Sequence, residues 1–75
     1  MNFKNMKIEI NKDQPLDEVV SELERLCYIK WAWTGDECNW VQTWDDAEYT
    51  NAYELDKSEL DYHTTITLAE LKEMK

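Results

Sequence analysis

The sequence predicts a small α+β domain in which an antiparallel sheet of three or four strands packs on one amphipathic helix, with a short C-terminal helix. Three observations support this fold class. Apolar residues recur at helical spacing after Pro15, runs rich in β-branched and aromatic residues alternate with polar ones, and a capping sequence precedes the last apolar residues. With 75 residues, of which 43% are hydrophobic, the chain suits a single domain spanning 1–75 with its own core.

The first two elements are a strand and a helix. Residues 6–10, MKIEI, alternate apolar and charged side chains, which is the period of a half-buried strand. Residues 15–28 predict a helix, because Pro15 suits a first helical turn and acidic residues follow it near the positive helix N-terminus. The apolar stripe that this helix buries comprises Leu16, Val19, Val20, Leu23, Leu26 and Cys27.

The next segment predicts a β-hairpin. Two runs rich in aromatic and β-branched residues, 29–34 and 40–44, flank Gly35-Asp36, which holds the only glycine of the chain and suits a turn. Within the first run, Trp31 and Trp33 share a face by alternation, so we expect both to pack in the core beneath the helix.

Residues 45–55 allow two interpretations. Asp45 with Glu48 resembles a capping box, which favours a short helix. The tyrosine and threonine content of the same segment favours a strand instead. We prefer a short helix or an irregular segment here.

The C-terminal residues predict a strand followed by a helix. Residues 62–68, YHTTITL, have the composition of a strand. Thr67 with Glu70 forms a capping box for a short helix that follows. His63, the only histidine, stands beside one acid in sequence, and we expect a surface strand residue rather than a catalytic group.

No catalytic, cofactor or metal motif is present. One glycine excludes Gly-rich nucleotide loops, and no EF-hand spacing occurs. Cys27 and Cys38 lack the spacing of a zinc knuckle, so we expect two free thiols, no cofactor, no metal and no enzymatic activity. The N-terminal residues lack the apolar run of a signal peptide or a membrane helix, which predicts a cytoplasmic protein with no membrane association, located in the host cytoplasm if a phage encodes it.

The charge distribution is the most informative feature. Residues 36–61 hold nine carboxylates and one lysine, a net charge of −8 out of −9 for the whole chain. This stretch would repel DNA, RNA and anionic membranes, but it suits a basic protein surface, where aromatic side chains add contact area. The predicted partner-binding residues are Asp36, Glu37, Trp40, Asp45, Asp46, Glu48, Tyr49, Tyr53, Glu54, Asp56, Glu59 and Asp61.

These features favour a non-enzymatic acidic interaction protein. Its most specific form is a nucleic-acid mimic that inhibits a DNA- or RNA-handling protein, by analogy of size and charge with anti-CRISPR and anti-restriction proteins of phages and mobile elements. In the alternative, the chain is a small adaptor that binds a protein through its aromatic sheet or an edge strand, and the charge serves solubility.

Overall fold

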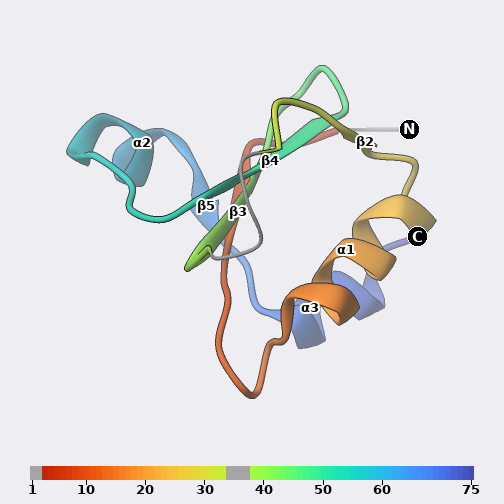
Figure 1. Ribbon diagram of the computed structural model, residues 1–75. Coiled ribbons are helices and arrows are strands. Elements are labelled where there is room, and N and C mark those ends of the chain that lie inside the picture. Colours follow the sequence, from red (N-terminus) through yellow and green to blue (C-terminus); the bar gives the residue numbers. More distant parts are fainter. Residues whose placement is uncertain (1–2, 34–37) are drawn as a thin grey trace.

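The computed structural model describes residues 3–33 and 38–75 and has an α+β fold (Figure 1), which confirms the predicted class. Along the chain the elements are β1 (Met6–Glu9), α1 (Leu16–Arg25), β2 (Ile29–Lys30), β3 (Trp40–Thr43), β4 (Glu48–Ala52), α2 (Lys57–Tyr62), β5 (Thr64–Thr65) and α3 (Leu68–Glu73). The strands form one sheet in the order β2-β4-β3-β1-β5. The pairs β1–β3 and β3–β4 are antiparallel, whereas β1–β5 and β2–β4 are parallel. The expected sheet of three or four antiparallel strands is therefore corrected to a mixed sheet of five.

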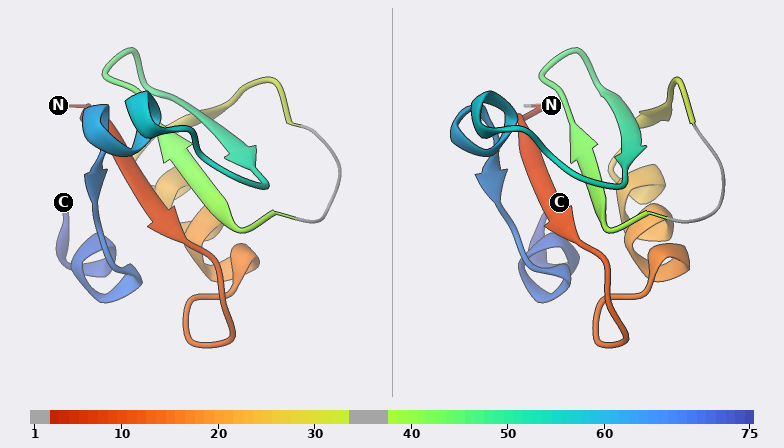
Figure 2. Two further views of the ribbon diagram at one scale, coloured as in Figure 1. Left: turned by 90° about the vertical axis from the view of Figure 1, so that its left-hand side faces the viewer. Right: turned by 60° about the vertical axis from the view of Figure 1, so that its left-hand side comes forward.

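The helices lie on both faces of this sheet (Figure 2). α1 and α3 contact each other on one face, and α2 lies on the opposite face. The apolar core fills the space between the sheet and the α1–α3 pair. It consists of Met6, Ile8, Val19, Leu23, Leu26, Tyr28, Val41, Tyr49, Leu68 and Leu71.

α1 confirms the expected amphipathic helix, but it is shorter than predicted. Its inward side chains, such as Leu23, are fully buried. The chain leaves the helix at Cys27, whose φ of 72° is left-handed. The N–H of Tyr28 donates to Leu23 O (3.0 Å) and that of Cys27 donates to Glu24 O (3.0 Å), the pattern of a Schellman C-cap. Cys27 is consequently exposed and does not belong to the buried stripe.

The predicted hairpin between residues 29–34 and 40–44 is wrong. β2 pairs with β4, and β3 pairs with β1 and β4, so the two runs are not neighbours in the sheet. The proposed turn at Gly35-Asp36 lies outside the described residues.

The burial expected for this segment is also wrong in part. Ile29 and Trp31 are 65% and 56% exposed, because Ile29 lies in β2, a two-residue strand at the edge of the sheet, and Trp31 follows that strand directly. Ala32 has a φ of 50°, which breaks the strand alternation between the two tryptophans. Only Trp33 packs against the core, with its ring edge-to-face on Tyr49 at 5.9 Å between centroids.

The hairpin that does form joins β3 to β4 within the acidic stretch. Trp44 N–H donates to Glu48 O (2.9 Å), and Ala47 N–H donates to Trp44 O (3.1 Å). Ala47 has a φ of 75°, so the three-residue loop has the form of a type I turn followed by a left-handed residue. The strand interpretation of this segment is thus correct for residues 48–52, and the preferred helix is wrong.

The predicted C-terminal helix is confirmed, whereas the strand before it is shorter than predicted. β5 holds two residues of the seven expected. The capping box of α3 is present: Thr67 Oγ1 accepts from the N–H of Glu70 at 3.1 Å, and Glu70 Oε1 accepts from the N–H of Thr67 at 3.1 Å.

Candidate functional site

α2 owes its place on the open face of the sheet to polar contacts. A capping box starts the helix, with Asp56 Oδ1 accepting from the N–H of Glu59 at 2.9 Å. Hydrogen bonds, the largest contribution coming from that backbone N–H, hold the pKa of Asp56 below its ordinary value. Asp45 and Glu48 have the same D-x-x-E spacing, which predicts a helix start, but the chain turns there instead.

Two buried side chains of the sheet attach α2 to it by hydrogen bonds. Lys7 Nζ donates to His63 O at 2.9 Å and also to Leu60 O, both at the C-terminal end of α2, where a cation is favourable. Gln42, its neighbour across β1 and β3, donates from Nε2 to Glu59 Oε2 at 2.7 Å. Since no residue of α2 is itself buried, these polar contacts are its principal attachment.

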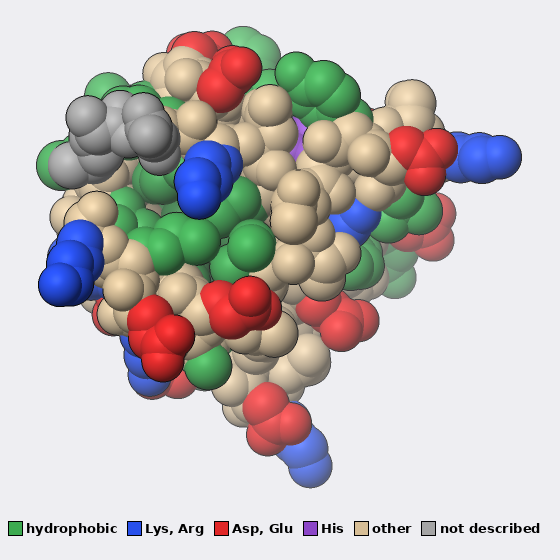
Figure 3. Space-filling model, turned by 180° about the vertical axis from the view of Figure 1, so that it is seen from behind, with side chains coloured by type: hydrophobic (Ala, Val, Ile, Leu, Met, Phe, Trp, Pro, Cys, Tyr) green, Lys and Arg blue, Asp and Glu red, His purple; other side chains and the backbone are tan. Residues whose placement is uncertain are grey.

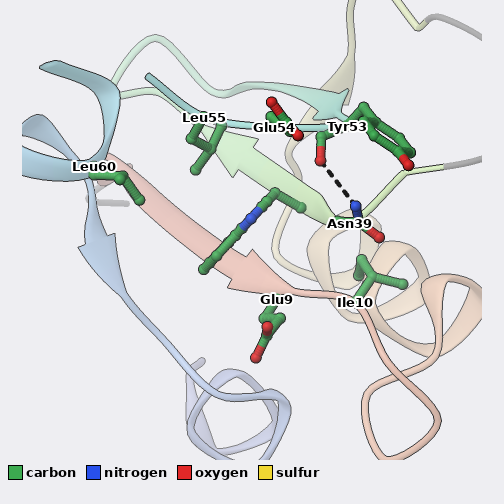
Figure 4. A pocket seen from close by; sticks show the side chains of 8 residues that line it. Glu9, Ile10, Asn39, Tyr53, Glu54, Leu55 and Leu60 are labelled. Atoms are coloured by element: carbon green, nitrogen blue, oxygen red, sulfur yellow. Dashed lines mark hydrogen bonds between the residues drawn. The ribbon is translucent and has the colours of Figure 1, made fainter. Parts of the chain in front are cut away.

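A groove of about 400 Å³ lies beside this attachment, on the same face of the sheet (Figure 4). We call it the acidic groove. Its lining comes from β1, β3 and the residues next to them, from the segment that leads from β4 into α2, and from α2 itself. It comprises Glu9, Ile10, Asn39, Trp40, Tyr53, Glu54, Leu55 and Leu60.

The sheet register and one hydrogen bond shape the acidic groove. Glu9 stands directly opposite Trp40 in the β1–β3 pair, so both point to the same face. Asn39 Nδ2 donates to Tyr53 O at 3.0 Å and ties the far wall to the strand (Figure 4). The groove thus combines two aromatic side chains with the exposed carboxylates of Glu9 and Glu54, and none of its lining residues is basic.

Three predicted binding residues therefore meet in one place: Trp40, Tyr53 and Glu54. Glu9 was missed, because it belongs to β1, far from the acidic stretch in sequence. The alternation of MKIEI already placed it on the outer face of its strand, which was the available signal.

The remaining predicted residues are distributed over several elements. Asp45 and Asp46 lie in the β3–β4 turn, Glu48 opens β4, and Asp56, Glu59 and Asp61 belong to the cap and body of α2. Asp36 and Glu37 lie outside the described residues. Both ion pairs found in the described part of the chain, Arg25–Glu22 and Lys72–Glu18, lie outside the acidic stretch. The face seen from behind carries basic as well as acidic side chains (Figure 3), so acidity is not uniform over the surface.

Tyr49 is a correction. It is fully buried in the core, and its hydroxyl donates to Glu24 Oε2 at 2.9 Å, so in this fold it offers no surface to a partner. Burial first, and then the hydrogen bond and charge of Glu24, raise the pKa of Tyr49 to about 12. The strand places Tyr49 inward, whereas Tyr53 comes after the end of β4 and is 64% exposed.

His63 is a second correction, because it is 4% exposed rather than a surface residue. It follows α2 directly and lines a hollow of about 300 Å³ beside that helix, where Ser58, Glu59 and Tyr62 contribute to the lining. We call this space the His63 hollow; its lining residues are Trp44, Ser58, Glu59, Tyr62 and His63.

Both cysteines are free thiols, Cys27 exposed and Cys38 half-buried. Burial raises the pKa of the Cys38 thiol. Among the described residues, no three His, Cys, Asp or Glu side chains gather in a way that could hold a metal ion. Within those same ranges, no helix combines the length and apolar character needed to cross a membrane.

Comparison of the chain with models of known protein families, with curated proteins and with solved structures finds no match.

Proposed function

We propose that this chain is a non-enzymatic interaction protein that binds a basic protein surface through the acidic groove and the exposed carboxylates near it. The observation that supports this function is the composition of the groove. Glu9 and Glu54 flank Trp40 and Tyr53 there, and no lysine or arginine of the described ranges lines the space to neutralise them.

This combination fits a lysine or arginine side chain. The methylene stem of such a residue packs on aromatic surface, while its charged head stays near carboxylates. Tyr and Trp are also the residue types that most often dominate binding energy at protein interfaces. The groove therefore offers contact area and charge together, which a purely solubilising charge distribution does not require.

The more specific proposal is a nucleic-acid mimic of the viral or mobile-element type, acting as an inhibitor. Asp45, Asp46, Glu54, Asp56 and Asp61 are all exposed on the loops and helix beside β3 and β4. A protein that binds nucleic acid presents lysine and arginine to a phosphate backbone. The exposed carboxylates of this protein would bind the same lysine and arginine side chains in place of the phosphates.

The test compares two variants that change the net charge equally. Glu9→Gln/Glu54→Gln removes two carboxylates from the acidic groove, and Asp13→Asn/Glu73→Gln removes two exposed ones elsewhere. Binding of a decalysine peptide is measured by tryptophan fluorescence at about 50 and 200 mM salt. Affinity should fall steeply with salt, as electrostatic binding does. Since an exposed ion pair contributes about 0–1 kcal/mol, the groove variant should bind roughly three- to tenfold more weakly and the control variant within twofold.

Equal affinities for the two variants would exclude the acidic groove as the binding surface. For the mimic, the natural partner is isolated from host lysate by salt-graded elution, and nucleic acid is then added as a competitor. A partner whose binding is unaffected by nucleic acid would contradict mimicry while leaving the interaction function intact.

One observation favours the adaptor as a second candidate. Ile29 in the edge strand β2 and Trp31 directly after it are largely exposed, and a partner strand or an apolar side chain could add to the sheet there. Trp31→Ala separates the two candidates. If this variant loses partner binding while Glu9→Gln/Glu54→Gln keeps it, the adaptor is the better account.

A further inference from the structure

The His63 hollow brings aromatic rings together with the imidazole of His63. The His63 ring stands nearly perpendicular to the rings of Trp44 and Tyr62, with centroids 5.1 and 5.3 Å away. Glu59 adds a carboxylate to the lining, and Ser58 adds a hydroxyl that already donates to Asp56. The hollow is therefore a small aromatic space with one carboxylate and one imidazole.

The hydrogen bonds of His63 determine which of its nitrogens is available. Nδ1 lies 3.2 Å from Glu59 O. A carbonyl oxygen only accepts, so Nδ1 carries the proton and donates it. In the neutral ring Nε2 is then an acceptor, and this atom is buried with no hydrogen-bond partner among the residues that the structure describes. A buried acceptor left without a donor is unfavourable, so a ligand that supplies a donor there gains more than it would in water.

We propose that the His63 hollow binds the guanidinium group of an arginine side chain. This rests on the proposed function, because it names the residue type by which the basic partner is recognised. A guanidinium is planar, stacks on aromatic rings and offers only donors, which matches the walls and the acceptor of the hollow. The exposed carboxylates of Asp45 and Asp61, next in sequence to Trp44 and Tyr62, add a favourable field for a cation and an unfavourable one for an anion.

Lysine fits the same space less well. Its ammonium is a compact and strongly hydrated charge, and it does not stack as a plane between two rings. The proposal therefore distinguishes arginine from lysine, whereas the acidic groove accepts either.

Entry requires one side chain to move. Nε2 is covered by its surroundings, and the neighbouring Tyr62 ring is 61% exposed. Such a ring can rotate into solvent without opening the core, because it is not part of the core cluster. A partial rotation of this ring admits the guanidinium, which then stacks on the Tyr62 ring beside His63 and keeps the Trp44 contact.

The experiment uses small capped probes and the whole protein. N-acetyl-argininamide, N-acetyl-lysinamide and N-acetyl-citrullinamide are titrated separately near about pH 8, where imidazoles are ordinarily neutral. NMR follows the ring ¹⁵N signals of the single histidine and the indole N–H of Trp44. We expect saturable binding of the arginine probe, of about millimolar strength for so small a ligand, with an upfield shift of Nε2 as it accepts a hydrogen bond. The lysine probe should bind at least about threefold more weakly, and the neutral citrulline probe should not saturate.

Variants at Tyr62 test the hollow without disturbing the core. Tyr62→Ala should lower the affinity for the arginine probe at least about fivefold. Tyr62→Phe, which retains the ring, should bind the probe with an affinity within about twofold of the original. Asp13→Asn, an exposed acid elsewhere, is the control for a general charge effect. An Nε2 signal that does not move, or equal responses to arginine and citrulline, would overturn the proposal.

The same titrations separate this inference from the proposed function. If the arginine probe fails at the hollow while decalysine still binds the acidic groove, only the arginine site is refuted. If the arginine probe binds the hollow but decalysine shows no salt-dependent binding, the groove function fails and the arginine site remains.

Discussion

Replacing Ala47 with glycine should stabilise the protein, although it removes a methyl group. Ala47 adopts a φ of 75° in the turn between β3 and β4, a region that side chains with a Cβ atom populate at a cost. Its N–H donates to Trp44 O, and its carbonyl accepts from the N–H of Ile29 at 2.7 Å. Both contacts are made by the backbone, so a glycine retains them.

The magnitude follows from two opposing contributions. A residue other than glycine in the left-handed region costs about 1–2 kcal/mol, and glycine relieves that strain. Glycine also adds about 0.5–1 kcal/mol of conformational freedom to the unfolded chain. The net gain should be about 0.5–1 kcal/mol, which corresponds to a rise in Tm of roughly 2–8 °C for a domain of this size.

Ala52 provides the matched control. It lies at the end of β4 in extended conformation and is also half-buried, so Ala52→Gly should lower stability by about 0.5–1 kcal/mol. Urea unfolding followed by tryptophan fluorescence measures both variants against the parent. If Ala47→Gly and Ala52→Gly destabilise equally, the left-handed turn is not present and the β3–β4 hairpin must be built differently.

Three further predictions test the rest of the fold. Leu23→Ala should cost about 2–5 kcal/mol of unfolding free energy in urea, because Leu23 is fully buried; a loss below about 0.5 kcal/mol would mean that α1 does not cover the core. Lys7→Met should cost about 1–3 kcal/mol and speed hydrogen exchange in α2, whose terminal carbonyls it leaves unsatisfied, while the exposed Lys4→Met should do neither. The raised pKa of Tyr49 favours the protonated phenol in the folded state, so its contribution is complete below about pH 10 and is lost as the pH rises towards 12, at no more than about 1.4 kcal/mol per pH unit. Tyr49→Phe should remove that part of the pH dependence, and an unchanged profile in urea unfolding would contradict it.

Sequence alone predicts correctly those elements whose stabilising contacts come from residues close by in the chain. The apolar period of residues 16–25 and the capping box at Thr67 act within one or two helical turns, so sequence alone predicts α1 and α3. The prediction of the hairpin is wrong because it places the turn at the only glycine. In the structure the β3–β4 turn contains a left-handed alanine, Ala47, instead. α2 was missed although Asp56 and Glu59 carry the same capping pattern that was assigned eleven residues earlier.

The candidate site was predictable only in part, for a related reason. Trp40, Tyr53 and Glu54 were chosen by residue type, and the fold does bring them to one groove. Glu9 lies beside them because it pairs with Trp40 across β1 and β3. The residue pattern of a single strand does not specify this register. The burial of His63 likewise depends on contacts with Trp44 and with α2. The pattern of residues 62–68, which predicts a surface strand residue, contains no information on these contacts.

α2 links the two proposed sites, and this leads to a last prediction. Leu60 lines the acidic groove and Tyr62 lines the His63 hollow, yet α2 has six residues and buries none of them. An element held mainly by polar contacts opens more readily than one packed in the core, so its amides should exchange faster than those of α1. A ligand that binds only the closed α2 slows this opening by a factor of 1 + [L]/Kd, about tenfold when decaarginine is present at ten times its Kd. Hydrogen exchange with mass spectrometry should therefore show slower exchange across residues 57–62 and little change in the buried half of α1. Equal slowing of both helices would indicate global stabilisation instead, and no slowing at a saturating peptide concentration would place the peptide away from α2.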